Sequence, residues 1–159
     1  MEIKMALYLP RDAASVPVTR RVLDRCLETL GVTPDTRADI ALALSEACAN
    51  VVQHAGPGQE YQVQVSARNG QCVIEVVNAG SVQGGRGTGQ ERFSARALAS
   101  GAVPATAEHG RGLAIINAVT DNMQLTGNER HGTTVHFEKT LQWMPGAAGQ
   151  QLLNADGGS

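Results

Sequence analysis

Side chains capable of acid–base chemistry or metal binding recur at a helical spacing near the middle of the chain. Glu46, Asn50 and His54 are successive i, i+4 neighbours, so a helix would present a carboxylate, an amide and an imidazole along one face. The opposite side would carry apolar residues that can seat the helix against a sheet, namely Leu44, Ala47, Cys48, Val51 and Val52. Asn and His are mediocre helix formers, which predicts a chemical role for the polar face.

The composition excludes several classes of protein. With 159 residues the chain is long enough for one domain with a core, and its net charge of -2 lacks the basic excess of a nucleic-acid-binding domain. No apolar run approaches the roughly 18 residues of a membrane span, and the N-terminus has no signal-like apolar region. Cys26, Cys48 and Cys72 lack C-x-x-C spacing and are interpreted as reduced core thiols. We therefore expect a cytoplasmic protein that binds neither nucleic acid nor membrane.

Apolar periodicity predicts the order strand, two helices, hairpin, loop, helix, hairpin. The expected strands are residues 3–9, 61–65, 72–76, 123–126 and 133–141, and the expected helices are 16–30, 34–54 and 112–119. In the first helix the recurring apolar positions are Val18, Val22, Cys26 and Leu30. Asn69 and Gly70 form a two-residue turn signal between the strands of the first hairpin. Helices partly segregated from antiparallel strands favour an α+β, two-layer sandwich.

Two stretches of the chain lack this periodicity. Residues 78–110 are rich in Gly, Ser, Ala and Thr, and a connection of this length is typical of a lid or a binding loop. Residues 142–159 are rich in Pro, Gly, Ala and Gln, and we expect a flexible tail there.

A glycine-containing segment precedes the last expected helix, with the sequence Glu108-His109-Gly110-Arg111-Gly112-Leu113. Backbone N–H groups and the positive end of a helix dipole bind anions in such an arrangement. A purely steric role for the glycines is equally open, since glycine serves turns of every kind. The run Gly84-Gly85-Arg86-Gly87-Thr88-Gly89 fits neither a phosphate loop nor a dinucleotide-binding turn and is interpreted as part of a lid.

Taken together, four segments resemble the ATP-binding boxes of the GHKL (Bergerat-fold) ATPase superfamily, in the same order. They are Glu46-x-x-x-Asn50-x-x-x-His54-Ala55, Asn78-Ala79-Gly80, Gly110-Arg111-Gly112-Leu113 and Gly132-Thr133-Thr134-Val135. Over residues 1–141 the chain is most similar to the small anti-sigma factor serine/threonine kinases of Gram-positive bacteria. This resemblance implies a mixed, mostly antiparallel sheet covered by helices on one face, with 78–110 as the nucleotide lid.

The resemblance also implies ATP and Mg²⁺ as ligands of the site. Asn50 would supply an amide oxygen to Mg²⁺, and Glu46 would accept the proton of the attacking hydroxyl. His54 is interpreted as a structural histidine that supports the end of the helix. The remaining nucleotide contacts implied are Asn78, Gly80, Gly110, Arg111, Gly112, Leu113, Thr133 and Thr134.

The chain departs from the family pattern where adenine is read. The pattern is Asp-x-Gly-x-Gly, whereas this chain has Asn78 in place of the Asp and lacks the second Gly. The amide oxygen of Asn78 can still accept a hydrogen bond from the adenine amino group. An NH₂ group left buried without a partner would cost about 1–3 kcal/mol of binding free energy.

Two functions remain open. The first is an anti-sigma factor that sequesters an RNA polymerase sigma factor and phosphorylates a serine or threonine of an anti-anti-sigma factor. The second is a binding module of the same fold that has lost tight ATP binding through Asn78. A detached histidine-kinase ATPase domain is disfavoured, because residues 1–33 contain no long coiled-coil helix with an acceptor histidine. By resemblance we also expect a homodimer that uses the first strand.

Overall fold

The computed structural model describes residues 1–54, 60–79, 107–128 and 132–154. Along these residues the elements are β1 (Ile3–Pro10), α1 (Ser15–Leu30), α2 (Pro34–His54), β2 (Glu60–Arg68), β3 (Gln71–Ala79), α4 (Ala107–Val119), β4 (Asn122–Asn128), β5 (Gly132–Thr140) and α5 (Ala148–Leu153). None of the helices within those ranges is both long and apolar enough to cross a lipid bilayer.

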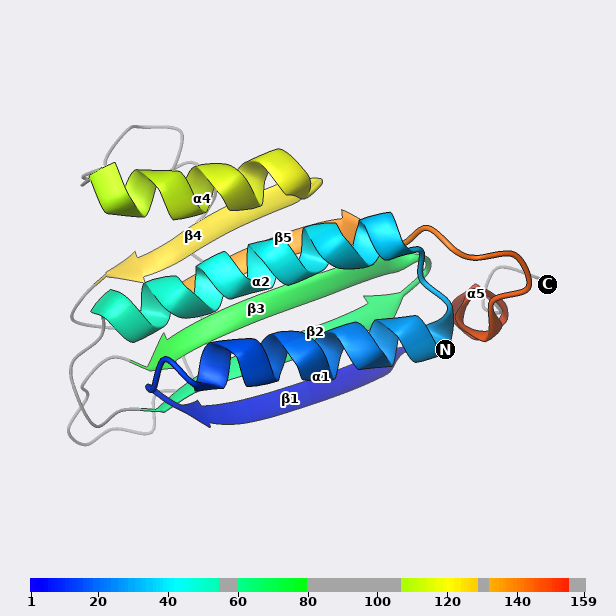
Figure 1. Cartoon of the computed structure of the whole chain (residues 1–159), viewed down its shortest axis with the longest axis horizontal. Helices are drawn as coiled ribbons and strands as arrows, with labels where there is room; N and C mark the ends of the chain where they lie inside the picture. Colours follow the sequence, from blue (N-terminus) through cyan, green and yellow to red (C-terminus); the bar gives the residue numbers. More distant parts are fainter. Residues whose placement is uncertain (55–59, 80–106, 129–131, 155–159) are drawn as a thin grey trace.

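The strands form one five-stranded sheet in the order β1-β2-β3-β5-β4. Each of the pairings between described strands is antiparallel. The family resemblance implied a mixed, mostly antiparallel sheet, and the described strands contain no parallel pair. Figure 1 shows α1, α2 and α4 lying side by side over one face of this sheet. The predicted α+β fold with a helix layer on one face is therefore confirmed.

Residues of period two build the core between the layers. Along β2 the side chains of Tyr61, Val63, Val65 and Ala67 are buried beneath the helices, while the alternate residues face away. The same face of β3 and β5 contributes four fully buried side chains, Ile74, Val76, Val135 and Phe137. Each such apolar side chain contributes roughly 1.5–3 kcal/mol when it leaves water, so the middle of the sheet is the best anchored part of the fold.

The other face of the sheet, which no helix of the described ranges covers, is mostly polar; it is called the uncovered face below. At its centre His136 on β5 lies between two carboxylates, with Nδ1 3.0 Å from Glu75 Oε1 and Nε2 3.0 Å from Glu138 Oε1. The side-chain amide of Gln71 donates to the second carboxylate, at 3.3 Å from Glu138 Oε2. These contacts link β3 and β5 from the solvent side, which fixes the register of the two strands.

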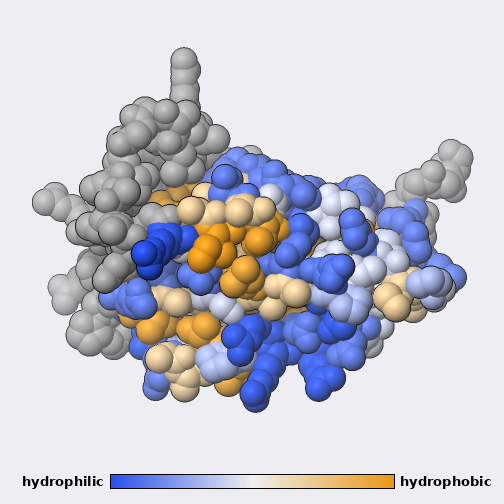
Figure 2. Space-filling model, turned by 45° about the horizontal axis from the view of Figure 1, so that its top comes forward, coloured by the Kyte–Doolittle hydropathy of each residue, from blue (hydrophilic) through white to orange (hydrophobic). Residues whose placement is uncertain are grey.

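The buried face of α1 differs from the face that the sequence pattern predicts. Ser15, Thr19, Leu23 and Leu27 are buried, whereas Val18 and Val22 are exposed and Cys26 is exposed as well. The polar members can be buried because their hydroxyls are bonded: Thr19 Oγ1 donates to the Ser15 carbonyl, and Ser15 Oγ shares a hydrogen bond with the Tyr61 hydroxyl at 2.6 Å. Apolar residues thus remain on the surface, and Figure 2 shows apolar patches within a mostly hydrophilic surface on one side of the molecule.

Two tight turns contain residues with positive φ, a backbone geometry that favours glycine. Between β2 and β3, Asn69 and Gly70 both have positive φ, 50° and 74°, as a two-residue hairpin turn demands. After α1, Gly31 has φ 88°, and the N–H groups of Gly31 and Val32 donate to the carbonyls of Glu28 and Leu27. The predicted hairpin turn and the predicted end of the first helix at residue 30 are therefore confirmed.

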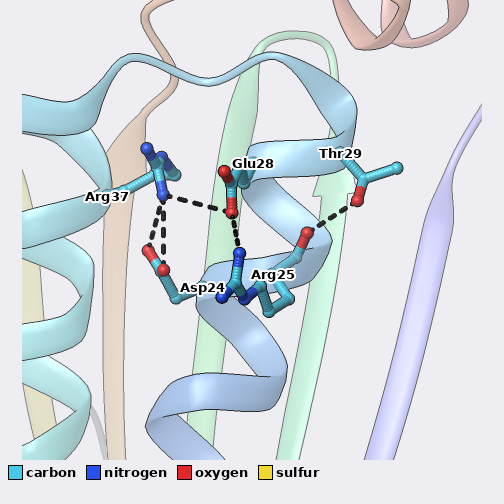
Figure 3. Close-up of polar contacts among 5 residues, drawn as sticks. All are labelled: Asp24, Arg25, Glu28, Thr29 and Arg37. Carbon is cyan, nitrogen blue, oxygen red and sulfur yellow. Dashed lines mark hydrogen bonds and ion pairs between the residues drawn. The ribbon is translucent and has the colours of Figure 1, made fainter.

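A charged cluster joins the first two helices, as Figure 3 shows. Arg37 of α2 donates to both carboxylate oxygens of Asp24 on α1, at 3.1 and 3.3 Å, and its Nη1 lies 3.9 Å from Glu28 Oε2. Arg25 reaches the same glutamate at 2.9 Å, but its side chain is 80% exposed compared with 18% for Arg37. Arg25 and Glu28 both belong to α1, so in this cluster Arg37 makes the link to α2, and its shielding from water strengthens the ion pair.

We expect Arg37→Met to lower the free energy of unfolding by about 1–2 kcal/mol, because the partly buried Asp24 carboxylate loses its ion-pair partner. Arg25→Met is the matched control and should change the same quantity by less than about 0.5 kcal/mol. Urea denaturation followed by circular dichroism measures both. Equal losses of unfolding free energy in the two variants would show that the partly buried pair between the helices contributes no more to stability than the exposed pair within α1.

The segment expected to be a flexible tail is part of the fold as far as Asn154. Trp143 pairs with Val32, and α5 packs against the end of α1 with Leu153 fully buried. A Cβ at Gly149 would lie 2.6 Å from the Leu30 carbonyl oxygen, so only glycine permits this approach. The expectation failed because composition reports the many small residues of the segment but not the surface on which they pack. Residues 155–159 lie outside the described ranges.

The three cysteines differ in their surroundings. Burial raises the pKa of the Cys48 thiol and that of the Cys72 thiol to about 12 each, whereas Cys26 is exposed. A raised thiol pKa keeps the group protonated, and only the thiolate is a strong nucleophile. The interpretation as core thiols is therefore confirmed for two cysteines and wrong for Cys26.

At pH 8 we expect iodoacetamide to alkylate Cys26 in the folded protein and to leave Cys48 and Cys72 unmodified. All three should react in urea, where the buried thiols regain an ordinary pKa. Peptide mass spectrometry after a timed reaction measures the modified fraction at each position. Comparable labelling of Cys48 in the folded state would contradict its place in the core.

Candidate functional site

The helices α2 and α4 run antiparallel and approach closely at Glu46. A Cβ built on Gly112 of α4 would lie 3.2 Å from Glu46 Oε2, so the carboxylate rests directly on the α4 backbone. Further along the pair, Lys139 of β5 donates to Asp39 Oδ2 at 3.1 Å and to the Val119 carbonyl at 2.8 Å. This lysine joins the start of α2 to the end of α4 and thereby sets the position of α4 along α2.

Asn50 lies one turn beyond Glu46 on the same side of α2 and is partly buried. Since Asp39 is level with Val119 and Glu46 is level with Gly112, the antiparallel pairing brings the Asn50 position level with the first turn of α4. The pairing of α2 with α4 therefore brings the backbone of Glu46 and Asn50 beside the glycine segment. His54 is the last residue of α2, and its side chain lies outside the described part of the structure.

The sequence pattern predicts that the glycines of the segment Gly110-Arg111-Gly112-Leu113 precede a helix. In the structure they lie within one. α4 begins at Ala107, so Gly110 and Gly112 occupy its first turns. A helical glycine costs about 1 kcal/mol relative to alanine, and at Gly112 the cost is explained by the contact with Glu46. Arg111 is exposed to solvent, while Leu113 is partly buried and packs against the core.

Asn78 and Thr133 face each other across β3 and β5 on the helix-covered side of the sheet. The Oδ1 atom of Asn78 is buried and has no hydrogen-bond partner among the residues that the structure describes. Thr134, by contrast, pairs with Val77 and therefore points to the opposite, uncovered face. Of the two threonines predicted to contact the base, Thr133 shares the face of Asn78 and Thr134 does not.

These residues lie at one end of the molecule. Figure 1 shows the C-terminal ends of α2 and β3 beside the N-terminal ends of α4 and β5, at the left of the view. Glu46 lies further from that end than Asn50, because α2 runs towards it. Gly80 and most of the expected lid, residues 80–106, fall outside the described ranges.

Arg11 is a residue near this end that the sequence pattern did not single out. Its Nη2 donates to the carbonyls of Val51 and Val52, at 3.1 and 3.5 Å, which caps the last turn of α2. Its Nε and Nη1 are buried without a partner in the described part of the chain, and loss of hydration lowers the pKa of the guanidinium. A single arginine after a strand has no recognisable spacing, so only the structure identifies it.

Comparison with known families gives a match over most of the chain. A family model described as a histidine kinase-like ATPase domain matches residues 9–139. Curated relatives include the serine-protein kinase RsbW of Bacillus thuringiensis (strain Al Hakam), which is 27% identical over 139 residues covering 87% of this chain and 86% of the relative. The serine-protein kinase RsbW of Bacillus velezensis is 29% identical over 137 residues, covering 85% of this chain and 84% of the relative.

Solved structures share the fold at lower sequence identity. The RsbU and RsbW domains of a Mycobacterium tuberculosis protein superpose with a TM-score of 0.63 and 18% identity, over 87% of this chain. This chain spans about a third of that protein, 32%. A chain of the SiaB–SiaC complex of Pseudomonas aeruginosa superposes with a TM-score of 0.56 and 17% identity, over 84% of this chain and 88% of that one.

Proposed function

The chain belongs to the histidine kinase-like ATPase domain family, and from this premise we propose that it is an anti-sigma factor with protein serine/threonine kinase activity. In this proposal it binds ATP and Mg²⁺ at the end of the sheet where Asn50, Asn78 and Thr133 lie. It transfers the γ-phosphate to a serine or threonine of an anti-anti-sigma factor, and in another state it holds a sigma factor.

The unbonded Oδ1 of Asn78 is the observation that best supports nucleotide binding. Buried polar atoms in folded proteins nearly always have a hydrogen-bond partner, and an unmet one costs about 1–3 kcal/mol. The exocyclic amino group of adenine is a donor of the kind that this acceptor lacks. Binding of the base would therefore satisfy the atom.

The proposed chemistry assigns separate roles to the residues of α2 and α4. The Glu46 carboxylate accepts the proton of the substrate hydroxyl as the hydroxyl oxygen attacks the γ-phosphorus and ADP leaves. The Asn50 amide oxygen would hold Mg²⁺, a hard cation that neutralises phosphate charge. The first turn of α4, from Ala107 onward, would face the phosphates, because its N–H groups have no partner inside the helix and the helix dipole favours negative charge there. Gly110, Arg111 and Gly112 follow directly after this turn.

The similarity to RsbW kinases supports the choice of a protein substrate rather than a small molecule. The SiaB–SiaC complex supports a fold that docks a partner protein. A homodimer through β1 fits its position at the edge of the sheet, where β2 is its neighbour on one side and no other strand of the described structure pairs with it.

Asn78 also favours a second candidate function, a binding module that regulates a partner without catalysis. An acceptor-only Asp in the family pattern selects the adenine amino group, whereas the Asn78 amide also carries an NH₂ group that needs an acceptor. If the bound base offers none, ATP affinity falls by about five- to a hundredfold.

Two measurements separate these functions. The purified protein is incubated with γ-labelled ATP, Mg²⁺ and candidate antagonist proteins, and ATP is titrated in a calorimeter. Label on a serine or threonine of the antagonist, together with heat on titration, supports the kinase. No transfer and no heat would leave the binding module, which a pull-down with sigma factors then tests.

We expect Gly112→Ala to lower the transfer rate roughly 10–100-fold, because the new methyl group displaces the Glu46 carboxylate by a few tenths of an ångström or more. The same change should raise the free energy of unfolding by up to about 1 kcal/mol, since alanine favours helix. Exposed Ala114→Ser on α4 is the control. A loss of stability together with activity would instead point to disrupted helix packing.

A further inference from the structure

Three described residues at the proposed base-binding position have neutral side chains, each of which can act as donor or acceptor. Asn78 offers a carboxamide, and Thr133 opposite it offers a hydroxyl. On the other side Asn78 pairs with Tyr61, whose hydroxyl already shares a hydrogen bond with Ser15. Neither a carboxylate nor a cation lies at these three paired positions of the sheet.

Purines differ in the polarity of the edge that such groups read. Adenine presents a donor at N6 and an acceptor at N1, whereas guanine and hypoxanthine present an acceptor at O6 and a donor at N1. A carboxylate can only accept, so it discriminates between the two patterns. A carboxamide matches either pattern, because a half-turn about its last bond exchanges Oδ1 and Nδ2.

We propose that Asn78 makes the nucleotide site accept 6-oxopurine nucleotides, such as GTP and ITP, as well as ATP. With adenine, Asn78 Oδ1 accepts from N6 and Nδ2 donates to N1. With a 6-oxopurine, the turned amide donates to O6 and accepts from N1. The hydroxyl of Thr133 reverses its role in the same way. This inference rests on the proposed function, since it concerns the same site.

The test is calorimetric titration of the full chain with ADP and with inosine diphosphate (IDP) in the presence of Mg²⁺. IDP has the 6-oxo group without the additional amino group of guanine, so the comparison isolates the edge that Asn78 reads. We expect the two dissociation constants to lie within about fivefold of each other, a difference of less than one hydrogen bond.

Asn78→Asp should weaken IDP relative to ADP by about tenfold or more, because a carboxylate facing O6 has nothing to donate. Thr126→Val is the matched control, since Thr126 of β4 pairs with Thr134 and so lies on the uncovered face, away from Asn78. It should leave the ratio of the two constants unchanged.

The outcomes separate this inference from the proposed function. Binding of ADP with IDP more than about fiftyfold weaker overturns the inference and leaves the kinase proposal standing, because that ratio exceeds the loss of one ordinary hydrogen bond. Binding of both with an unchanged ratio in Asn78→Asp also overturns it, since Asn78 then does not read the base. Binding of neither nucleotide overturns the proposed ATP site and the inference together.

Discussion

Replacing Glu46 by glutamine is expected to slow phosphate transfer about 10²–10⁴-fold, which is the usual contribution of a positioned general base. Glutamine keeps the shape of the side chain that rests on Gly112 but cannot take the proton of the attacking hydroxyl. Nucleotide affinity should hardly change, because the carboxylate acts on the hydroxyl and not on the base. Transfer rates at saturating ATP, compared with the calorimetric affinity, measure the two effects separately.

Glu2→Gln is the matched control for this substitution, since Glu2 is exposed just before β1. Its carboxylate lies 3.6 Å from Lys4 Nζ, a long ion pair at the surface. The control should transfer phosphate at the wild-type rate. If Glu46→Gln keeps its activity as well, another group must accept the proton. If it loses nucleotide affinity in proportion to its rate, Glu46 contributes to binding and not specifically to the chemical step.

Replacing Asn50 by alanine is expected to remove the Mg²⁺-dependent part of ATP binding. The amide oxygen is the only ligand that the proposal takes from the protein, and Mg²⁺ does not readily exchange its ordered octahedral shell for a looser one. Titrations of ATP with Mg²⁺ and with EDTA should differ for the wild type and coincide for Asn50→Ala. Transfer to the antagonist protein should then be lost.

Exposed Asn117 on α4 provides the control for the loss of an amide. Asn117→Ala should retain the difference between the two titrations. An Asn50→Ala protein that still binds ATP more tightly with Mg²⁺ would refute the ligand role. Its circular dichroism spectrum should match that of the wild type, because the side chain is near the end of α2 and is only partly buried.

The elements with a strong local signal were predictable from the sequence. The hairpin of β2 and β3 has its turn at Asn69 and Gly70, and α2 begins at Pro34. In these cases the signal lies in the backbone itself, because positive φ favours glycine and asparagine, and proline suits the first turn of a helix. Such preferences act over a few residues and need no knowledge of the rest of the fold.

Features that depend on a distant partner were not predictable. The buried face of α1 includes Ser15 and Thr19 because Tyr61, far along the chain, accepts or donates a hydrogen bond there. The extension of α4 back to Ala107 and the docking of α5 likewise depend on surfaces offered by other helices. Local propensity favours the opposite outcome at each of these positions, and tertiary packing overrides it.

In the candidate site, too, the features with a local sequence signal were predictable and those that depend on distant residues were not. The helical spacing of Glu46 and Asn50 placed them on one side of α2, and their chemical roles stay predictions. The choice of Thr133 over Thr134 required the register of β3 and β5, since neighbouring residues of a strand point to opposite faces. The contact of Gly112 with Glu46 and the cap that Arg11 forms on α2 required the arrangement of the helices.

The packing of α5 has a practical consequence for experiments on the protein. Figure 1 shows the start of β1 and the helix α5 at the right of the view, the end of the sheet remote from Asn78. An affinity handle, a fluorophore or a chip linker attached at Met1 or Asn154 would thus lie at the end of the sheet opposite to the proposed nucleotide site. Immobilised protein should remain competent to bind both, which suits it to surface-based screening of candidate sigma factors and antagonists.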